Sequence, residues 1–425
     1  MNVHAAAQSA DLGVDTPTPT PPRKGEGLES AVEFKDVDIL FGKAGGGKRD
    51  AVMSKALALM EAGSTRSQIA SETGVVLGVA GANLTVKAGE ISVLMGLSGS
   101  GKSTLLRAAN GLNTVTRGQV LVRHQGGVVD VASCDPPTLR EVRRKSIAMV
   151  FQQFALLPWR TVRDNVGLGL EFQGMDKAER KRVVDEKLEL VGLSEWAERK
   201  TQELSGGMQQ RVGLARAFAT DADILLMDEP FSALDPLIRS RLQDELISLQ
   251  ESVHKTIIFV SHDLDEALKL GDQISIMEGG RIVQTGTAED IVLRPANDYV
   301  GQFVRHMNPL SVLTGATVMR CIDDLTAESG GVYLDSLRRY RLELDSDQRP
   351  TAALVDGETH ALVRFGDQEG PIRPDSMILA EAGLPLSAII RICQANRHPV
   401  LLVDDGRLLG VCGETEILKA LSGER

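Results

Sequence analysis

The sequence has few cysteines, no long apolar run and no excess of basic residues. Its four cysteines show neither C-x-x-C nor Cys/His spacing, so we expect reduced thiols in a reducing compartment. No stretch of eighteen apolar residues occurs and the N-terminus lacks an apolar signal core, which predicts a soluble, cytoplasmic chain. Because 47 basic and 58 acidic residues give a net charge of −11, nucleic acid is disfavoured as the main ligand.

Length and composition predict more than one folded unit. A chain of 425 residues with 42% hydrophobic content can bury one large core and a smaller second one. Residues 1–29 are small, polar and proline-rich (TPTPTPP), so we expect a disordered tail. After Pro309 the composition shifts again, which places a domain boundary there.

A phosphate-binding loop is the clearest local signal. GLSGSGKST, Gly96 to Thr104, fits G-x-x-x-x-G-K-[ST], and we refer to it as the P-loop. The apolar run Ile91 to Met95 predicts a strand before it, and Leu105 to Ala109 predicts a helix after it. Such a loop points backbone N–H groups at the phosphates of ATP. We therefore expect nucleotide contacts from Gly96, Ser98, Gly99, Ser100, Gly101, Lys102, Ser103 and Thr104. Lys102 supplies charge to the β and γ oxygens, and Ser103 is free to reach Mg²⁺.

Acidic residues follow a second buried strand. The apolar residues Ile224 to Met227 predict a strand of a parallel sheet, which delivers Asp228 and Glu229 to the sheet edge where α/β proteins bind ligands. Asp228 suits Mg²⁺, and Glu229 suits a general base for the attacking water. Alone, such a pair is equally consistent with a solvated strand end. The P-loop upstream favours the catalytic interpretation.

LSGGMQQR, Leu204 to Arg211, shows what the nucleotide is for. Together with ILLMDEP, it resembles the ATP-binding cassette (ABC) ATPases, and the likeness runs from about residue 32 to 308. It implies an α/β fold with a RecA-like parallel sheet, an antiparallel β subdomain and a helical signature subdomain. The family's Q-loop would be Phe151-Gln152, its D-loop Ser232 to Asp235 and its switch histidine His262.

The resemblance also assigns roles within the site. It implies that Gln152 contacts Mg²⁺ and the attacking water, and that His262 contacts the γ-phosphate. It implies a head-to-tail homodimer with two ATP molecules, in which the residues of one copy complete the site of the other: Ser205, Gly206, Gly207 and Asp235. An aromatic residue before the P-loop strand stacks on adenine in this family. The candidate is Phe41, in an edge-strand pattern of alternating apolar residues.

Residues 43–78 form an insertion between Phe41 and the next strand. Apolar residues at helical spacing, with Gly63 as a stop and Ser64 as a polar start, predict a helical pair. The outline is similar to a helix-turn-helix DNA reader, but only Arg66 is basic in the second helix. We therefore prefer a second likeness, to the ATPases of glycine betaine, proline and choline importers, most closely a choline importer.

That narrower resemblance implies partners. Phrases such as REVRRKSIAMVFQQFALLPWRTV (Arg140 to Val162) and SHDLDEALKLGDQISIM (Ser261 to Met277) carry it. It implies an integral membrane permease, a periplasmic or lipid-anchored substrate-binding protein, and a peripheral position on the cytoplasmic face of the bacterial inner membrane. The apolar stretch Phe154 to Trp159 would then line the groove for a coupling helix of the permease. Its alternative is a packing stripe within the helical subdomain.

The C-terminal region resembles half of a cystathionine-β-synthase (CBS) pair. Pro385 to Leu421 predicts a helix, the strand Val400 to Val403, an Asp-Asp-Gly turn, the strand Leu408 to Cys412 and a closing helix. Only a strand-turn-strand at Ala353 to Phe365 suggests the first half, which is degenerate or shortened. We expect an ABC ATPase domain at 30–308 and a small α+β CBS-like domain at 309–425. The latter is either a dimerising appendage without ligand or a sensor of an adenine nucleotide or ionic strength.

These inferences predict an ATPase that drives import of choline or glycine betaine. Within transport, the alternative is an importer of another small solute, since LLPWRTV also resembles taurine, sulfonate and nitrate importers. A soluble ABC ATPase acting on nucleic acid or ribosomes is the alternative outside transport. We expect two cassettes and basic arms in such a protein, whereas this chain has one LSGGM and an acidic balance.

Overall fold

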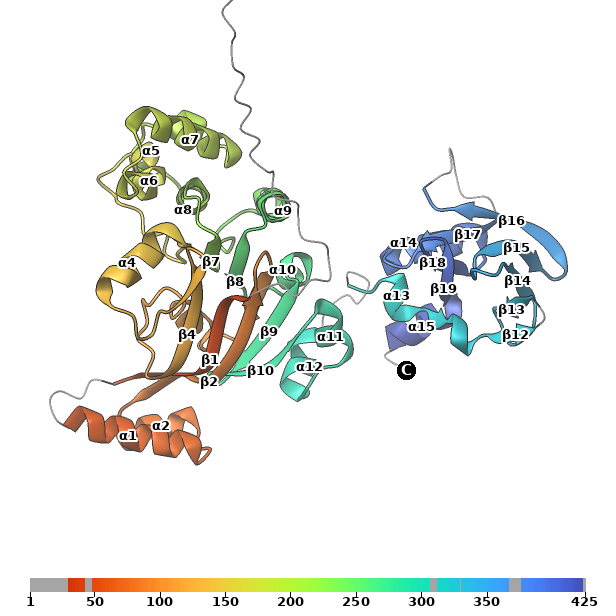
Figure 1. The fold of residues 1–425 in the computed structure, drawn as a ribbon, viewed down its shortest axis with the longest axis horizontal. Coiled ribbons are helices and arrows are strands. Elements are labelled where there is room, and N and C mark those ends of the chain that lie inside the picture. The colour runs from red at the N-terminus through yellow and green to blue at the C-terminus, as the bar shows by residue number, and fades with distance from the viewer. Residues whose placement is uncertain (1–29, 43–47, 306–311, 329, 367–375, 423–425) are drawn as a thin grey trace, which may run out of the picture.

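A computed structural model describes residues 30–42, 48–305, 312–328, 330–366 and 376–422. The predicted tail at 1–29 lies outside the described residues. Two folded units are visible in Figure 1, an N-terminal unit up to residue 305 and a C-terminal unit from residue 312. Neither contains, among its described residues, a helix long and apolar enough to cross a lipid bilayer.

A four-stranded antiparallel sheet opens the N-terminal unit, in the order β2-β1-β4-β5. Its strands are β1 (Ser30–Phe41), β2 (Val76–Lys87), β4 (Arg117–His124) and β5 (Gly127–Asp130). β1 pairs with β2 on one side and β4 on the other, so the edge-strand prediction for β1 is wrong. The alternation resembles that of an edge strand because Lys35 and Asp36 are exposed where the register shifts.

The central sheet has six strands in the order β10-β9-β3-β8-β7-β6. They are β3 (Ile91–Met95), β6 (Ile147–Val150), β7 (Ile224–Asp228), β8 (Thr256–Val260), β9 (Gln273–Glu278) and β10 (Arg281–Gly286). All pairs are parallel except β9 with β10, which confirms the predicted parallel sheet.

Both faces of this sheet are buried. Along β7, Leu225 and Met227 enter one hydrophobic core, whereas Ile224 and Leu226 enter another. The first core is shared with the helices, and the second with the antiparallel sheet. Because successive side chains point to opposite faces, a strand covered on both sides must be apolar throughout. This is why Ile224 to Met227 of β7 and Ile257 to Val260 of β8 are continuous apolar runs.

Helices surround the central sheet in two groups. Figure 1 shows the group α5 to α8 gathered together at one end of the unit. It contains α5 (Val162–Val166), α6 (Leu168–Phe172), α7 (Lys177–Leu190) and α8 (Gly206–Ala219). The others are α3 (Lys102–Leu106), α4 (Pro136–Lys145), α9 (Pro236–Val253), α10 (Leu264–Leu270), α11 (Ala288–Leu293) and α12 (Asp298–Val304). The helix predicted to continue to Ala109 ends at Leu106 and is followed by turns.

The insertion forms the predicted helical pair, α1 (Lys48–Glu61) and α2 (Arg66–Thr73). Gly63 adopts φ +81° between them, and the N-cap of α2 is Thr65, one residue after the predicted polar start. The pair has its own small core, which includes Leu40 from β1 and Leu77 and Ala80 from β2. It therefore packs against the antiparallel sheet, beside the strands that it interrupts in sequence (Figure 1).

The C-terminal unit is, in its described residues, a nine-stranded sheet with three α-helices, and its strands are in the order β11-β19-β18-β17-β16-β15-β14-β13-β12. Its strands are β11 (Arg320–Cys321), β12 (Thr326–Glu328), β13 (Gly331–Tyr333), β14 (Tyr340–Leu344), β15 (Pro350–Val355), β16 (Glu358–Arg364), β17 (Ser376–Glu381), β18 (Val400–Asp404) and β19 (Arg407–Cys412). Its helices are α13 (Gly315–Val318), α14 (Leu386–Asn396) and α15 (Glu414–Ser422).

The helix-strand-turn-strand-helix predicted from Pro385 to Leu421 is confirmed as α14, β18, β19 and α15. The region before it forms an antiparallel meander from β12 to β16, including the predicted hairpin at Asp356-Gly357. Between residues 312 and 366, α13 is the only α-helix among the described residues. The CBS likeness therefore rests on the second half alone.

Candidate nucleotide-binding site

The predicted catalytic residues meet at one edge of the central sheet. β3 leads into the P-loop, β7 ends in Asp228, β8 leads to Ser261 and His262, and β6 leads to Gln152. These four strands are neighbours in the order β3-β8-β7-β6, and all run in parallel. Their carboxyl ends therefore share an edge, which is where open α/β sheets bind ligands.

Backbone shape makes the P-loop a cradle. A Cβ on Gly96 would lie 2.2 Å from the carbonyl oxygen of Met277, and one on Gly101 would lie 2.6 Å from that of Gly78. Both glycines adopt left-handed φ values, so other residues would be strained as well as crowded. Ser100 Oγ is buried and has no hydrogen-bond partner among the described residues. A buried hydroxyl that lacks a hydrogen-bond partner within a glycine-rich loop is well placed to donate to a phosphate oxygen.

Lys102 is buried within this cradle. Its Nζ donates to the carbonyl oxygens of Gly96 at 2.8 Å and Leu97 at 3.0 Å. Burial lowers the pKa of the ammonium, and the nearby carboxylates of Glu229 and Asp228 oppose that shift. Two of the ammonium's three protons are therefore directed at the loop's own backbone, which holds the charge beside the phosphate position.

Ser103 and Asp228 provide the oxygen ligands expected of a magnesium site. Ser103 Oγ donates to Asp228 Oδ1 at 2.6 Å, and the Asp228 side chain is fully buried. Mg²⁺ usually takes one or two protein oxygens together with phosphates and waters, so this pair fits the ion. No cluster of three or more His, Cys, Asp or Glu side chains suited to a metal occurs among the described residues.

Arg107 is a site residue that the sequence reasoning missed. Its Nη2 donates to Asp228 Oδ2 at 2.7 Å, on the carboxylate oxygen opposite Ser103. Arg107 lies four residues after Ser103 and so on the same helical face, but its contact with a carboxylate 121 residues away is decided by packing. Arg107 balances the buried charge of Asp228.

The carboxylate of Glu229 lies close to the two remaining catalytic candidates, Gln152 and His262. Its Oε2 accepts from Gln152 Nε2 at 3.0 Å and lies 3.6 Å from His262 Nδ1. The backbone of Glu229 is left-handed, with φ +48°, and its carbonyl accepts from the buried side chain of Gln210 on α8 at 3.1 Å. Gln210 was also missed from sequence. The structure thus joins Gln152 to Glu229 by a hydrogen bond, and its predicted contact with Mg²⁺ stays a prediction.

A buried hydrogen-bond network lies at the carboxyl end of β8, next to His262. Ser261 Oγ donates to Glu266 Oε2 at 2.7 Å, and Gln243 Nε2 donates to Glu266 Oε1 at 3.2 Å. Burial raises the pKa of Glu266. His262 itself is largely exposed, with 61% of its side chain accessible, so it is free to contact a bound nucleotide.

Phe41 lies beside the P-loop. A Cβ on Gly78 would lie 2.8 Å from Phe41 Cε2 and 3.0 Å from Thr104 Cγ2, so the ring and Thr104 flank the same glycine. Phe41 is 43% exposed, which leaves ring surface available for stacking. This placement supports the prediction that Phe41 stacks on adenine.

The signature residues lie apart from this constellation. Ser205 and Gly206 are exposed, and the Ser205 side chain accepts from the Met208 N–H to cap α8. Asp235 is also exposed, and it caps α9 through the Ile238 N–H. In the described part of the chain, neither side chain hydrogen-bonds to the P-loop. They are therefore accessible to a second molecule.

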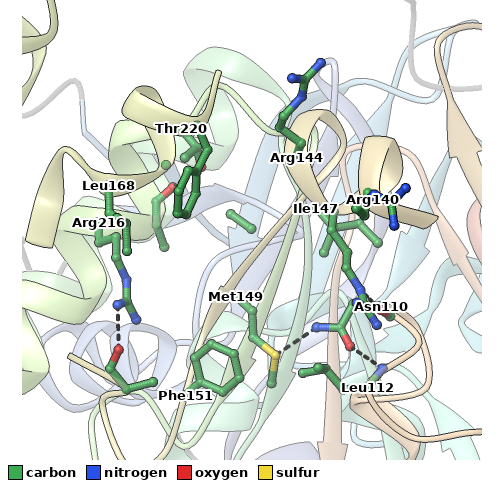
Figure 2. A pocket seen from close by; sticks show the side chains of 16 residues that line it. Asn110, Leu112, Arg140, Arg144, Ile147, Met149, Phe151, Leu168, Arg216 and Thr220 are labelled. Carbon is green, nitrogen blue, oxygen red and sulfur yellow. Dashed lines mark hydrogen bonds between the residues drawn. The ribbon is translucent and has the colours of Figure 1, made fainter. Parts of the chain in front are cut away.

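A hollow of about 530 Å³ lies between α4, β6, α6 and α8. Figure 2 shows Phe151 and Met149 on its apolar floor, with Arg140 and Arg144 on its rim. Phe172 and Leu112 line it and are 65% and 47% exposed. Of the stretch Phe154 to Trp159, only Ala155 contributes to the lining.

Arg216 shapes the loop that borders this hollow. It donates to the carbonyl oxygens of Ala155 at 2.8 Å and Phe154 at 2.9 Å, the first of which is drawn in Figure 2. Phe154 and Ala155 both adopt left-handed φ values. Arg216 therefore ties the loop that follows Gln152 to α8, which links the Gln152 segment to the hollow.

A family model described as ABC transporter matches residues 79–232. The chain is 42% identical over 405 residues to the glycine betaine/carnitine transport ATP-binding protein GbuA of Listeria monocytogenes, covering 93% of this chain and 98% of that protein. It is 42% identical over 404 residues to the glycine betaine/proline betaine transport system ATP-binding protein ProV of Escherichia coli, covering 92% and 98%.

Solved structures agree with the fold. A dimeric ATP-binding cassette in a post-hydrolysis state, bound to ADP and Pi, matches with a TM-score of 0.51 and 30% identity. The match covers 60% of this chain and 98% of that cassette. The relatives thus align over nearly their whole length, and the solved cassette aligns with a little over half of the chain.

Proposed function

Since this chain belongs to the ATP-binding subunits of the glycine betaine and proline betaine importers within the ABC transporter family, we propose that it hydrolyses ATP to drive uptake of a quaternary-ammonium solute through a membrane permease. The observation that carries the proposal is the meeting of Lys102, Asp228 and Glu229 at one sheet edge. Names of the relatives favour glycine betaine as the solute, and choline is the second candidate.

ATP is the substrate of this site. The P-loop and Lys102 bind its phosphates, and Ser103 and Asp228 would hold Mg²⁺, which neutralises charge on the phosphate oxygens when bound. Glu229 accepts a proton from the water that attacks the γ-phosphorus, while the bond to the ADP oxygen breaks. Gln152 and His262 hold the Glu229 carboxylate and orient that water. The products are ADP, phosphate and a proton.

Two copies of the chain form the active unit in this proposal. The exposed helix starts at Ser205 and Asp235 support it, because the Ser205 hydroxyl and the N–H groups of the first turn of α8 can donate to a nucleotide held by another molecule, while the Asp235 carboxylate can accept from it. The similar solved cassette is described as dimeric.

The permease docks in the hollow between α4 and α6. An apolar floor with an arginine rim suits an amphipathic helix with acidic or polar flanks. Docking there places the subunit at the cytoplasmic face of the membrane and connects the permease to Gln152 through the loop that Arg216 holds. A substrate-binding protein delivers the solute to the permease on the far side.

The C-terminal unit regulates this activity in the proposal. A second hollow of about 560 Å³ in this unit is lined by charged residues of both signs, including Arg320, Arg397 and Glu414. Mixed charge suits either salt-sensitive contacts or an anionic ligand such as an adenine nucleotide.

Reconstitution tests the proposal. The chain is assembled in proteoliposomes with the permease and the binding protein that co-purify with it. Uptake of labelled glycine betaine, choline and taurine is then compared with and without ATP inside. We expect uptake of glycine betaine or choline to require ATP. Glu229→Gln should bind ATP normally yet release phosphate at least 100-fold more slowly, because the amide cannot accept the proton. Taurine uptake without betaine or choline uptake would overturn the solute assignment.

A further inference from the structure

The helical insertion reaches the phosphate-binding loop through one side chain. Arg66, the first residue of α2, donates from Nη1 to the carbonyl oxygen of Gly99 at 2.5 Å. Its Nη2 donates to the carbonyl oxygen of Gly78 on β2. One guanidinium thus bridges the P-loop and the strand beside Phe41.

Among the described residues, Arg66 has no carboxylate partner. By contrast, the cations Lys55, Arg117 and Arg107 each pair with a carboxylate. Its Nε is buried and has no hydrogen-bond partner in the same set. A partly buried cation that binds only carbonyl oxygens retains its full positive charge. That charge lies directly behind the loop that receives triphosphate.

Peptide geometry explains what the bond to Gly99 does. In a trans peptide the C=O and the following N–H point in opposite directions, and here the Ser100 N–H donates to the carbonyl oxygen of Leu97 at 3.1 Å while Arg66 holds the Gly99 oxygen, so this peptide plane is fixed at both ends. Gly99 has φ +78° and Gly101 has φ +112°, and glycines give this segment the freedom to rotate. The next carbonyl, of Ser100, is held from Gly280 N at 2.9 Å. Arg66 holds the one before it.

The insertion is anchored well enough to position Arg66. Ile69, one helical turn after Arg66, is fully buried in the small core with Met60 and Leu77. On the other helix, Glu61 pairs with Arg117 of β4, which also binds Asp38. Hydrophobic contact and an ion pair therefore fix both helices against the antiparallel sheet.

We propose that Arg66 is a positioning residue for ATP, through which the insertion preorganises the P-loop and adds positive charge behind it. This rests on the proposed nucleotide site. Because Glu229, His262 and Gln152 lie at the other strand ends, loss of Arg66 should weaken nucleotide binding and leave the rate at saturation nearly unchanged. Preorganised groups contribute by lowering the cost of ordering the loop on binding.

Binding and kinetics of full-length variants test the inference. Kd for Mg·ATP is measured by fluorescence competition, with KM and kcat from phosphate release and the unfolding midpoint from thermal melting. For Arg66→Gln we expect Kd and KM to rise about tenfold, as for the loss of one charge-assisted hydrogen bond, with kcat within about twofold. Arg66→Lys keeps the charge but cannot bridge both carbonyls, so its Kd should lie between those of Arg66→Gln and the wild type.

Lys55→Gln is the matched control, because Lys55 is a charge of the same insertion that pairs with Glu72 at 3.3 Å. Its Kd and KM should equal those of the wild type. If Arg66 has only a structural role, Arg66→Gln should lower the unfolding midpoint but leave the Kd for Mg·ATP unchanged at temperatures below that midpoint. That result would overturn the inference. Failure of the wild type itself to bind ATP would instead overturn the proposed function.

Discussion

The pairing of Arg107 with Asp228 allows a quantitative prediction. Replacing Arg107 with methionine leaves a fully buried carboxylate without its cation. Removing one partner of a buried ion pair typically costs about 3–5 kcal/mol. Here the Arg107 side chain is 38% exposed and Ser103 still donates to Asp228, so water and the hydroxyl compensate part of the loss. We expect about 2 kcal/mol, or roughly 4–8 °C in the unfolding midpoint.

Magnesium should reduce this cost. When Mg²⁺ and ATP are bound, the ion replaces Arg107 as the positive charge beside Asp228. The stability difference between Arg107→Met and the wild type should therefore narrow with Mg·ATP and persist with ATP plus EDTA. Melting curves of both proteins without ligand, with Mg·ATP and with ATP plus EDTA measure this difference.

An exposed arginine provides the control for this experiment. Arg182 pairs with Glu179 at 2.6 Å, and both side chains are about half exposed or more. Arg182→Met should leave the unfolding midpoint indistinguishable from that of the wild type, because an exposed ion pair contributes little to stability. Equal small losses in the two variants, or a difference for Arg107→Met that Mg·ATP leaves unchanged, would refute the reasoning.

Four further outcomes are expected. In a mixed dimer, Ser205→Arg on one protomer should halve ATP occupancy in equilibrium dialysis, because it spoils the site held by the other protomer; full occupancy would contradict the dimer. Phe172→Arg should abolish co-purification with the permease and leave basal ATPase activity within about twofold, since this exposed residue of the hollow lies away from the catalytic edge. Retained co-purification would exclude the hollow as the docking site of the permease. Truncation at Pro309 should preserve basal ATPase and remove the ionic-strength dependence of transport, and an unchanged salt response would leave only a dimerising role. Burial raises the pKa of the Cys412 thiol to about 12, so iodoacetamide should alkylate the exposed Cys321 before Cys412 between pH 7 and 9, as followed by mass spectrometry. Alkylation of Cys412 before Cys321 would contradict its burial.

Much of the nucleotide site was predictable from local sequence because its parts are contiguous. The P-loop needs glycines at fixed spacing between a strand and a helix, and that requirement is visible in nine consecutive letters, GLSGSGKST. The strands before Asp228, His262 and Gln152 are apolar except for Thr256 at the start of β8, since both sheet faces are buried. Parallel pairing then brings their ends to one edge, so the catalytic set follows from the pattern.

Contacts between distant segments could not be predicted in this way. Arg66 meets Gly99 across 33 residues, and Gln210 reaches the Glu229 carbonyl from a different helix. Neither residue carries a local signal, since an arginine at a helix start and a glutamine within a helix are ordinary. The same limit explains β1, because whether a strand is at the edge depends on which strands lie beside it.

Taken by itself, the sequence determined which segments are strands, helices and turns around the catalytic edge, since spacing and burial pattern are properties of neighbouring residues. The tertiary structure decided which of those segments touch. It placed Arg107 on Asp228, Arg66 on the P-loop and Arg216 on the loop after Gln152, and each of these arginines binds an oxygen far away in the chain. The physical reason is that a guanidinium on a long, flexible stem can reach any nearby acceptor, so its partner is set by packing and not by its neighbours in sequence.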